Sequence, residues 1–239
     1  VHPNNPTGHF TKPWEAAELA RLCREFSLSL IVDEVFLDYE TGQKGQNPAV
    51  QTFAAGLQDT PVFVVSGLSK IAGLPQMKAA WIVVSSVATG PDRDSVRDQT
   101  LARLEVIADT FLSMNAPVQC ALPDWLNSRH AIQGQIRERT AANLAELDRQ
   151  LTRAPSTQRL SLEGGWYAVL RIPALEPDER TVLELLDRGV WVHPGYFFGM
   201  PESGWLVVSL LAPLQEFAAG VIILVDYLRT HQGSNITRP

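Results

Sequence analysis

The sequence predicts an α/β protein in which a mostly parallel sheet is followed by a small α+β domain. Residues 14–26 repeat apolar side chains at helical spacing, and an apolar run at residues 28–32 comes directly after them. Two more apolar runs follow at residues 62–65 and 80–84. Helix, strand, crossover and strand in this order are typical of βαβ units, which build parallel sheets.

The first helix carries start signals in its sequence. Thr11 is predicted to be the N-cap, because its hydroxyl can accept a hydrogen bond from a free backbone N–H. Pro13 is expected in the first turn, where its missing N–H breaks no hydrogen bond. Together these residues place the start of the helix close to Trp14.

The apolar runs at residues 28–32 and 62–65 are predicted to be buried strands. The first ends at Asp33, and the second leads into a segment that contains Lys70. Sheets of this type bind ligands outside the carboxyl ends of their strands. The residue pattern alone therefore predicts a ligand site near Asp33 and Lys70.

The second half of the chain is rich in predicted helix. Residues 95–112 are expected to be helical, and Asn115–Pro117 is expected to break that helix. A long helix from Pro123 to about Leu151 is predicted to follow, with domains at residues 1–122 and 123–239. The later elements are predicted as strands at residues 166–170 and 205–210, and helices at residues 178–188 and 214–230.

Composition excludes several classes of function. Hydrophobic residues make up 45% and charged residues 19% of the chain, as in ordinary globular proteins. A net charge of −6, with no basic block, argues against a nucleic-acid partner. The longest late apolar run, residues 221–225, is too short to span a membrane. Cys23 and Cys120 form no disulfide framework, and no metal motif is present, so we expect a reduced, cytoplasmic location.

Three local motifs occur in a fixed order along the first 78 residues. They are N4-N5-P6-T7-G8, I31-V32-D33-E34-V35-F36 and S66-G67-L68-S69-K70-I71-A72-G73-L74-P75-Q76-M77-K78. In this order and at these intervals they resemble the pyridoxal-phosphate site of class I/II (fold type I) aminotransferases. The resemblance implies a C-terminal part of the large cofactor-binding domain followed by the small domain, with the family's N-terminal half missing. It also implies a homodimer that acts on amino and keto acids.

The resemblance assigns roles to four residues of these motifs. Lys70 matches the lysine that forms a Schiff base with pyridoxal 5'-phosphate and then moves the substrate's α-proton. Asp33 matches the aspartate that holds the pyridine nitrogen protonated, and Asn5 matches the asparagine that donates to the ring oxygen. Ser69 is assigned to the cofactor site, whereas Glu34 is interpreted as structural. The alternatives are a solvated loop lysine, a loop-capping aspartate and a simple turn at Asn5.

Three positions depart from the family pattern. Phe36 stands where many members have a tyrosine, so the ring can pack but cannot donate a hydrogen bond. Lys78 stands where an arginine usually grips the cofactor phosphate, and it offers a point charge in place of a bidentate fork. Val207 stands where the family has the arginine that binds the substrate α-carboxylate.

The segment H193-P194-G195-Y196-F197-F198-G199 resembles a loop that lies near the substrate in the family. Tyr196 or His193 is a candidate substrate contact, and the competing interpretation is an ordinary turn with buried aromatic residues. Arg171 is the nearest spare cation in the sequence. It is a candidate replacement for the absent arginine, with a surface or interdomain salt bridge as the competing role.

The leading functional prediction is a pyridoxal-phosphate-dependent transaminase that uses Lys70. The departures at Phe36, Lys78 and Val207 favour an alternative, an aminotransferase-like module that binds a ligand without catalysis. A third reading is a pyridoxal-phosphate-dependent lyase acting on a different amine. The motifs do not identify the amino donor or the acceptor.

Overall fold

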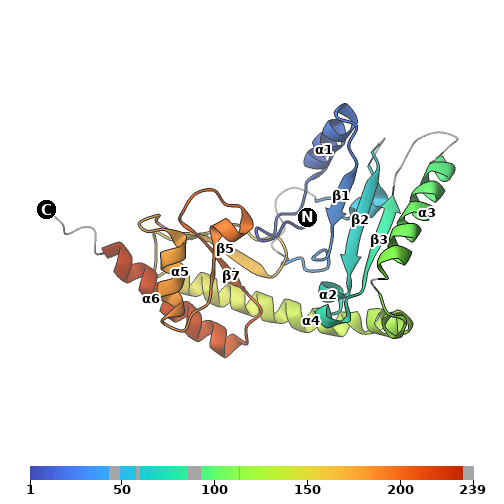
Figure 1. Cartoon of the computed structure of the whole chain (residues 1–239). Coiled ribbons are helices and arrows are strands. Elements are labelled where there is room, and N and C mark those ends of the chain that lie inside the picture. Colours follow the sequence, from blue (N-terminus) through green and yellow to red (C-terminus); the bar gives the residue numbers. More distant parts are fainter. Residues whose placement is uncertain (43–48, 58–59, 86–92, 113, 234–239) are drawn as a thin grey trace. The chain divides into compact units, whose positions relative to one another are not determined.

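The computed structural model describes residues 1–42, 49–57, 60–85, 93–112 and 114–233, which form two compact units (Figure 1). The first unit contains Val1–Asn4 and Phe10–Gly134, and the second contains Asn5–His9 and Gln135–Pro239. The point where the chain passes from one unit to the other lies inside a single long helix, α4 (Ala116–Leu151). The predicted domains at residues 1–122 and 123–239 stay predictions.

The first unit is built on a three-stranded sheet with the order β1-β2-β3. Strands β1 (Leu30–Asp33) and β2 (Val62–Gly67) are parallel, whereas β3 (Ala80–Ser85) is antiparallel to β2. The three strands therefore form a mixed sheet, in which the predicted parallel pairing holds for β1 and β2. The reason is the short connection from β2 to β3, which turns back at the same end of the sheet.

That connection contains two short helices, α2 (Leu68–Ile71) and η2 (Pro75–Met77). The backbone N–H of Leu68 donates to the carbonyl of Ala79, at 3.0 Å, and closes the turn at its base. A parallel return would require a crossover along the full length of the sheet. Both helices are too short to make one.

Helix α1 (Pro13–Glu25) confirms the predicted first helix but not its cap. The N-cap is Lys12, whose backbone N–H donates to the carboxylate of Glu15 at 2.7 Å. Thr11 lies one residue before the cap, so its prediction as the N-cap is wrong. The hydrogen-bond acceptor at the start of α1 is the Glu15 carboxylate, not the hydroxyl of Thr11.

Strands β1 and β2 are buried on one face, whereas no residue of β3 is fully buried. Val32, Val62 and Val64 pack with Ala16 and with Phe53, which begins the short helix η1 (Phe53–Ala55). On the strands' other positions, Ile31 is 70% exposed and Ile82 is 48% exposed. The prediction of a buried strand at residues 28–32 is therefore wrong for one face of β1. Alternating burial of this kind is the pattern of a sheet covered on one face.

Helix α3 (Arg93–Phe111) confirms the helix predicted at residues 95–112. Helix α4 begins at Ala116, seven residues before the predicted start, because the side chain of Asn115 accepts a hydrogen bond from Val118 N–H at 3.0 Å. Asn115 thus caps the start of α4. Pro123 lies inside α4 and does not start it.

The second unit contains an antiparallel sheet with the order β4-β5-β7-β6. Its strands are β4 (Gln158–Arg159), β5 (Tyr167–Arg171), β6 (His193–Pro194) and β7 (Trp205–Ser209). The helices are α5 (Asp178–Leu186), η3 (Gly195–Phe198) and α6 (Leu214–Gly233). These elements confirm the predicted α+β character of the tail. One sheet face packs against α4, α5 and α6 through a core that includes Leu147, Leu170, Leu206, Leu224 and Val225.

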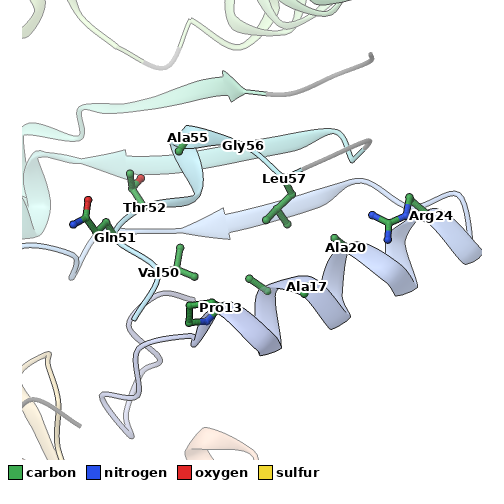
Figure 2. Close-up of a pocket in the computed structure, with 11 residues that line it drawn as sticks. Pro13, Ala17, Ala20, Arg24, Val50, Gln51, Thr52, Ala55, Gly56 and Leu57 are labelled. Atoms are coloured by element: carbon green, nitrogen blue, oxygen red, sulfur yellow. The ribbon is translucent and has the colours of Figure 1, made fainter. Parts of the chain in front are cut away.

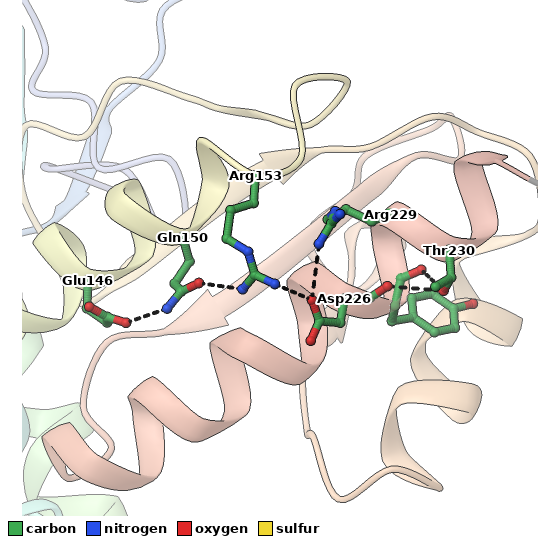
Figure 3. A network of polar contacts seen from close by, with 7 residues as sticks. Glu146, Gln150, Arg153, Asp226, Arg229 and Thr230 are labelled. Atoms are coloured by element: carbon green, nitrogen blue, oxygen red, sulfur yellow. Dashed lines mark hydrogen bonds and ion pairs between the residues drawn. The ribbon is translucent and has the colours of Figure 1, made fainter.

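A chain of polar contacts joins the end of α4 to α6 (Figure 3). Arg153 donates to Asp226 at 2.5 Å and to the side-chain oxygen of Gln150 at 2.8 Å. Gln150 donates in turn to Glu146 at 3.0 Å, and Arg229 lies 3.7 Å from Asp226. Arg153, Asp226 and Arg229 are exposed, so their ion pairs contribute little to stability.

Across the described ranges of the chain, no helix has both the length and the apolar content needed to cross a membrane.

Candidate functional site

Asp33 and Lys70 lie at the same edge of the sheet in the first unit. Strands β1 and β2 are parallel, and their register pairs Asp33 with Val65. Helix α2 follows β2 without a gap and carries Lys70 in its only full turn. Both residues are half-buried, and one carboxylate oxygen of Asp33 accepts a hydrogen bond from Val35 N–H at 3.0 Å. The sequence-based expectation of a common strand edge agrees with this arrangement.

Contacts from other elements hold the backbone around Lys70. The hydroxyl of Tyr39, a residue only 2% exposed, donates to the backbone carbonyl of Lys70 at 2.6 Å. The buried side chain of Gln133, on α4, donates to the carbonyl of Ile71 at 3.0 Å and to Asp38 at 2.9 Å. Sequence reasoning missed both residues. They act across 31 and 62 positions of the chain, and no local motif marks them.

Phe36 provides a surface beneath the ammonium group of Lys70. The Lys70 Nζ lies 5.6 Å from the centroid of the Phe36 ring, which is within the range of a cation–π contact. Phe36 is 4% exposed, so the ring is fixed by its surroundings. The predicted packing role of Phe36 agrees with this geometry, and the ring contacts the lysine itself.

Ser66 and Gly67 occupy the end of β2 just before Lys70. The Ser66 hydroxyl is buried and, within the described residues, has no hydrogen-bond partner. A Cβ added at Gly67 would lie 2.7 Å from the carbonyl oxygen of Ala79, so only glycine allows this close approach. Ser66 follows Val65, the register partner of Asp33, so the Ser66 hydroxyl and the Asp33 carboxylate project from opposite faces of the sheet.

Ser69 and Lys78 complete the residues predicted for this edge. Ser69 is half-buried in α2 beside Lys70. Lys78 is exposed at the end of η2, and its backbone is left-handed, with φ of 53°. A left-handed lysine is uncommon and carries backbone strain. Their roles as cofactor contacts stay predictions.

Asn5 belongs to the second unit, where it is exposed in a turn. The neighbouring Gly8 has a left-handed φ of 71°, and a Cβ there would lie 2.2 Å from the carbonyl of Gly164. The turn is therefore packed tightly against the segment before β5. The role of Asn5 toward a cofactor stays a prediction.

Val207 is fully buried in β7, and Arg171 lies near it on the same sheet. The Arg171 guanidinium donates to the carbonyl of Ser203 at 2.8 Å and stacks 4.6 Å from the Trp205 ring centroid. Its carboxylate neighbour, Glu202, is 3.9 Å away. Arg171 is thus already held by its own unit, which agrees with the competing salt-bridge interpretation. Its role as a substrate cation stays a prediction.

The loop at residues 193–199 exposes two of its aromatic side chains. Tyr196 is 50% exposed and Phe197 is 64% exposed. The interpretation of this loop as a turn with buried aromatic residues is therefore wrong for these two positions. Gly195 is required here, because a Cβ would lie 2.4 Å from the Cβ of Trp205.

Glu34 has the structural role that its sequence context indicates. It is 4% exposed, and its carboxylate accepts hydrogen bonds from Phe53 N–H at 2.6 Å and from the Thr52 hydroxyl at 2.8 Å. Burial raises the pKa of Glu34, and these two hydrogen bonds lower it to a smaller extent. Glu34 thus anchors the segment around η1 to the end of β1.

An open hollow of about 580 Å³ lies between α1 and the segment at residues 50–57 (Figure 2). Its α1 wall consists mainly of alanines, with Arg24 at one end. Its lining contains none of the residues predicted to bind the cofactor. The hollow therefore adds nothing to the site around Lys70.

Comparisons with known proteins identify the family. The model of the family "Aminotransferase class I and II" matches residues 1–217, so the chain belongs to this family. Members of this family normally depend on pyridoxal phosphate.

A tyrosine aminotransferase of Dictyostelium discoideum is 22% identical over 97% of this chain and 55% of its own length. A threonine-phosphate decarboxylase of Salmonella typhimurium is 31% identical over 36% of this chain and 22% of its own length.

The solved structures agree on the fold. An alanine aminotransferase from Pyrococcus furiosus superposes with a TM-score of 0.79 at 19% identity. The match covers 96% of this chain and 56% of that structure. At this identity the likeness shows an aminotransferase-like mixed α/β fold and nothing further. The chain spans about half the length of the relatives it matches.

Proposed function

We propose that the protein to which this chain belongs is a pyridoxal-phosphate-dependent transaminase that moves an amino group between an amino acid and a keto acid. One observation carries the proposal. Asp33 ends β1, and Lys70 lies in α2 directly after the adjacent parallel strand β2, so both residues lie at one edge of the sheet. The Lys70 Nζ lies over the Phe36 ring. Membership of the aminotransferase family supports the same function.

Bound pyridoxal phosphate supplies an aldehyde that combines with amines and a pyridine ring that withdraws electrons. Lys70 is the residue that holds the aldehyde in the resting state and then carries the proton at the substrate α-carbon. Asp33 faces the pyridine nitrogen in this proposal and keeps it protonated, since its second carboxylate oxygen is not used by Val35. The Lys70 ammonium lies over the Phe36 ring, and this ring has no hydroxyl that could donate a hydrogen bond to the cofactor.

Two alternatives follow from specific observations. The buried Val207 and the exposed Lys78 weaken two expected anion contacts, which favours a ligand-binding module without catalysis. The local likeness to a decarboxylase favours a lyase that uses the same cofactor. A homodimer, which the resemblance implies, and a reduced, cytoplasmic location, which the two cysteines favour, are part of the main proposal.

The experiment is a transfer assay with ¹⁵N-labelled amino acids and unlabelled keto acids in the presence of pyridoxal phosphate. Transfer of the label to the keto acid supports a transaminase. Release of carbon dioxide without transfer of label supports a lyase, and cofactor binding with neither reaction supports the module. Lys70→Ala is expected to abolish either reaction. The control is Arg103→Ala, which removes an exposed positive charge on α3 and is expected to change neither reaction.

A further inference from the structure

The Lys70 amine lies where two segments of the first unit meet. One segment is the turn at residues 35–38, which follows β1 and carries Phe36 and Asp38. The other is α2, which carries Lys70 and ends at Ile71. The Lys70 Nζ lies 5.6 Å from the centroid of the Phe36 ring, so the position of the amine depends on how the two segments are held together.

Gln133, on α4, binds both segments through one nitrogen atom. Its Nε2 donates to Asp38 Oδ2 at 2.9 Å and to the backbone carbonyl of Ile71 at 3.0 Å. Gln133 is 2% exposed, and all three residues belong to the first unit. Gln133 thus connects the turn after β1 to the helix that carries Lys70, although it lies outside the family motifs that contain these segments.

The chemistry of this position favours a side-chain amide. The carboxylate of Asp38 and the carbonyl of Ile71 are both acceptors, so they repel each other unless a donor lies between them. The amide nitrogen of glutamine carries two N–H groups and no net charge, so it can donate to both acceptors. An ammonium group could also donate to both, but its burial would take a full charge out of water. Gln133 therefore meets the chemical need of the junction between α2 and the turn at residues 35–38.

We infer that Gln133 is a positioning residue for Lys70, because it holds α2 and the turn after β1 in the arrangement that places the amine over its aromatic neighbour. The inference rests on the proposed function, in which Lys70 is the amine that reacts. Gln133 acts through its two acceptors, Asp38 and Ile71. The reactivity of Lys70 therefore depends on a side chain of α4, a helix that follows the motif segments in the chain.

The loss of this junction is expected to have a local effect on one amine. Lys70 is half-buried, so a looser α2 gives small reagents more access to its Nζ. Tyr39 still joins the two segments through its hydrogen bond to the Lys70 carbonyl, which keeps the change moderate. Lys12 is only 8% exposed, next to the start of α1, so its reactivity rises when the unit unfolds. The two lysines therefore separate a change at the junction from a general loss of stability.

The test is trace methylation of the 239-residue chain with formaldehyde and cyanoborohydride, in which mass spectrometry of the digested chain gives the rate at each lysine. Formaldehyde reacts with amines and no cofactor is added, so a failure of the proposed transaminase function does not affect the result. Gln133→Met keeps the length of the side chain and removes both donors. The rate at Lys70 is expected to rise about two- to fivefold, the size expected from the loss of a contact with the Phe36 ring. The rates at Lys12 and at the exposed Lys78 are expected to stay unchanged.

Two further variants complete the test. Asp38→Ala removes one of the two acceptors at an exposed position and is expected to give a smaller rise at Lys70, so the inference can be tested even if Gln133→Met does not fold. Gln119→Met is the matched control, because it removes an exposed glutamine of the same helix that donates to a backbone carbonyl at 3.0 Å. The inference is overturned if neither Gln133→Met nor Asp38→Ala changes the rate at Lys70. It is also overturned if Lys12 accelerates as much as Lys70, or if Gln119→Met has the same effect.

Discussion

The hydroxyl of Tyr39 donates a 2.6 Å hydrogen bond to the backbone carbonyl of Lys70, and both groups lie at the edge of the sheet where β1 and β2 end. This bond links the loop after β1 to the lysine that defines the family motif. It fixes the main chain of Lys70 without using the side-chain amine. The position of that amine therefore depends on a residue outside the motif.

Tyr39→Phe removes this hydrogen bond and leaves the Lys70 carbonyl with the longer, 3.4 Å hydrogen bond from Gly73 N–H. We expect the free energy of unfolding to fall by about 0.5–1.5 kcal/mol, as measured by urea denaturation. Tyr196→Phe, which removes a hydroxyl from a residue that is 50% exposed, is the matched control and should change stability little. Equal effects of the two variants would show that the Tyr39 bond does not hold the Lys70 loop.

Gly67→Ala tests the close approach of β2 to the start of β3. The new Cβ would lie 2.7 Å from the Ala79 carbonyl, which is backbone and cannot rotate away. We expect a loss of about 1–3 kcal/mol in the free energy of unfolding. Gly134→Ala, in helix α4 with no atom within 4 Å of the new Cβ, should instead gain about 0.5–1 kcal/mol. Stabilisation by both changes would contradict the packing described before Lys70.

Glu34 makes stability depend on pH. Its pKa is raised in the folded protein, mainly by burial, so the native state keeps the proton to a higher pH than the unfolded chain does. The free energy of unfolding contributed by Glu34 therefore falls as pH rises from the ordinary glutamate pKa through the raised value. Glu34→Gln cannot titrate, so its stability relative to wild type should increase across this window. Urea denaturation in steps of pH measures the difference, and a difference that is independent of pH would refute the prediction.

Lys78 is expected to bind the cofactor phosphate as a point charge. Lys78→Arg adds a bidentate fork and should tighten pyridoxal phosphate binding several-fold. Lys78→Gly removes the charge while accepting the left-handed φ of 53°, so it should weaken binding without lowering stability. Titrations followed by visible absorbance give both affinities. Unchanged affinity in both variants would remove Lys78 from the cofactor site.

The sequence predicted the parts of the fold that depend on local patterns. Helices α1 and α3 and the strand edge with Asp33 and Lys70 follow from periodicity and from the end of each apolar run. The direction of β3 could not be predicted, because the sequence pattern of a strand is the same whether it runs parallel or antiparallel to its neighbour. The short connection through α2 and η2 makes β3 antiparallel.

The contacts that hold the backbone around Lys70 could not be predicted either, because they depend on tertiary packing. Gln133 reaches Asp38 across 95 positions of the chain, and no local signal indicates such a contact. Ser66 lies inside the motif, but its burial without a partner depends on the packing of β2. The exposure of Tyr196 and Phe197 likewise depends on the fold of the loop, which its sequence does not reveal.

The most direct test of the central claim is to identify which lysine becomes joined to the cofactor. The 239-residue chain is incubated with excess pyridoxal phosphate, reduced with borohydride, digested and mapped by mass spectrometry. The account predicts that the cofactor mass is concentrated on the peptide with Lys70 and is lost in Lys70→Arg. Labelling spread evenly over Lys12, Lys44, Lys70 and Lys78, or unchanged by Lys70→Arg, would contradict it.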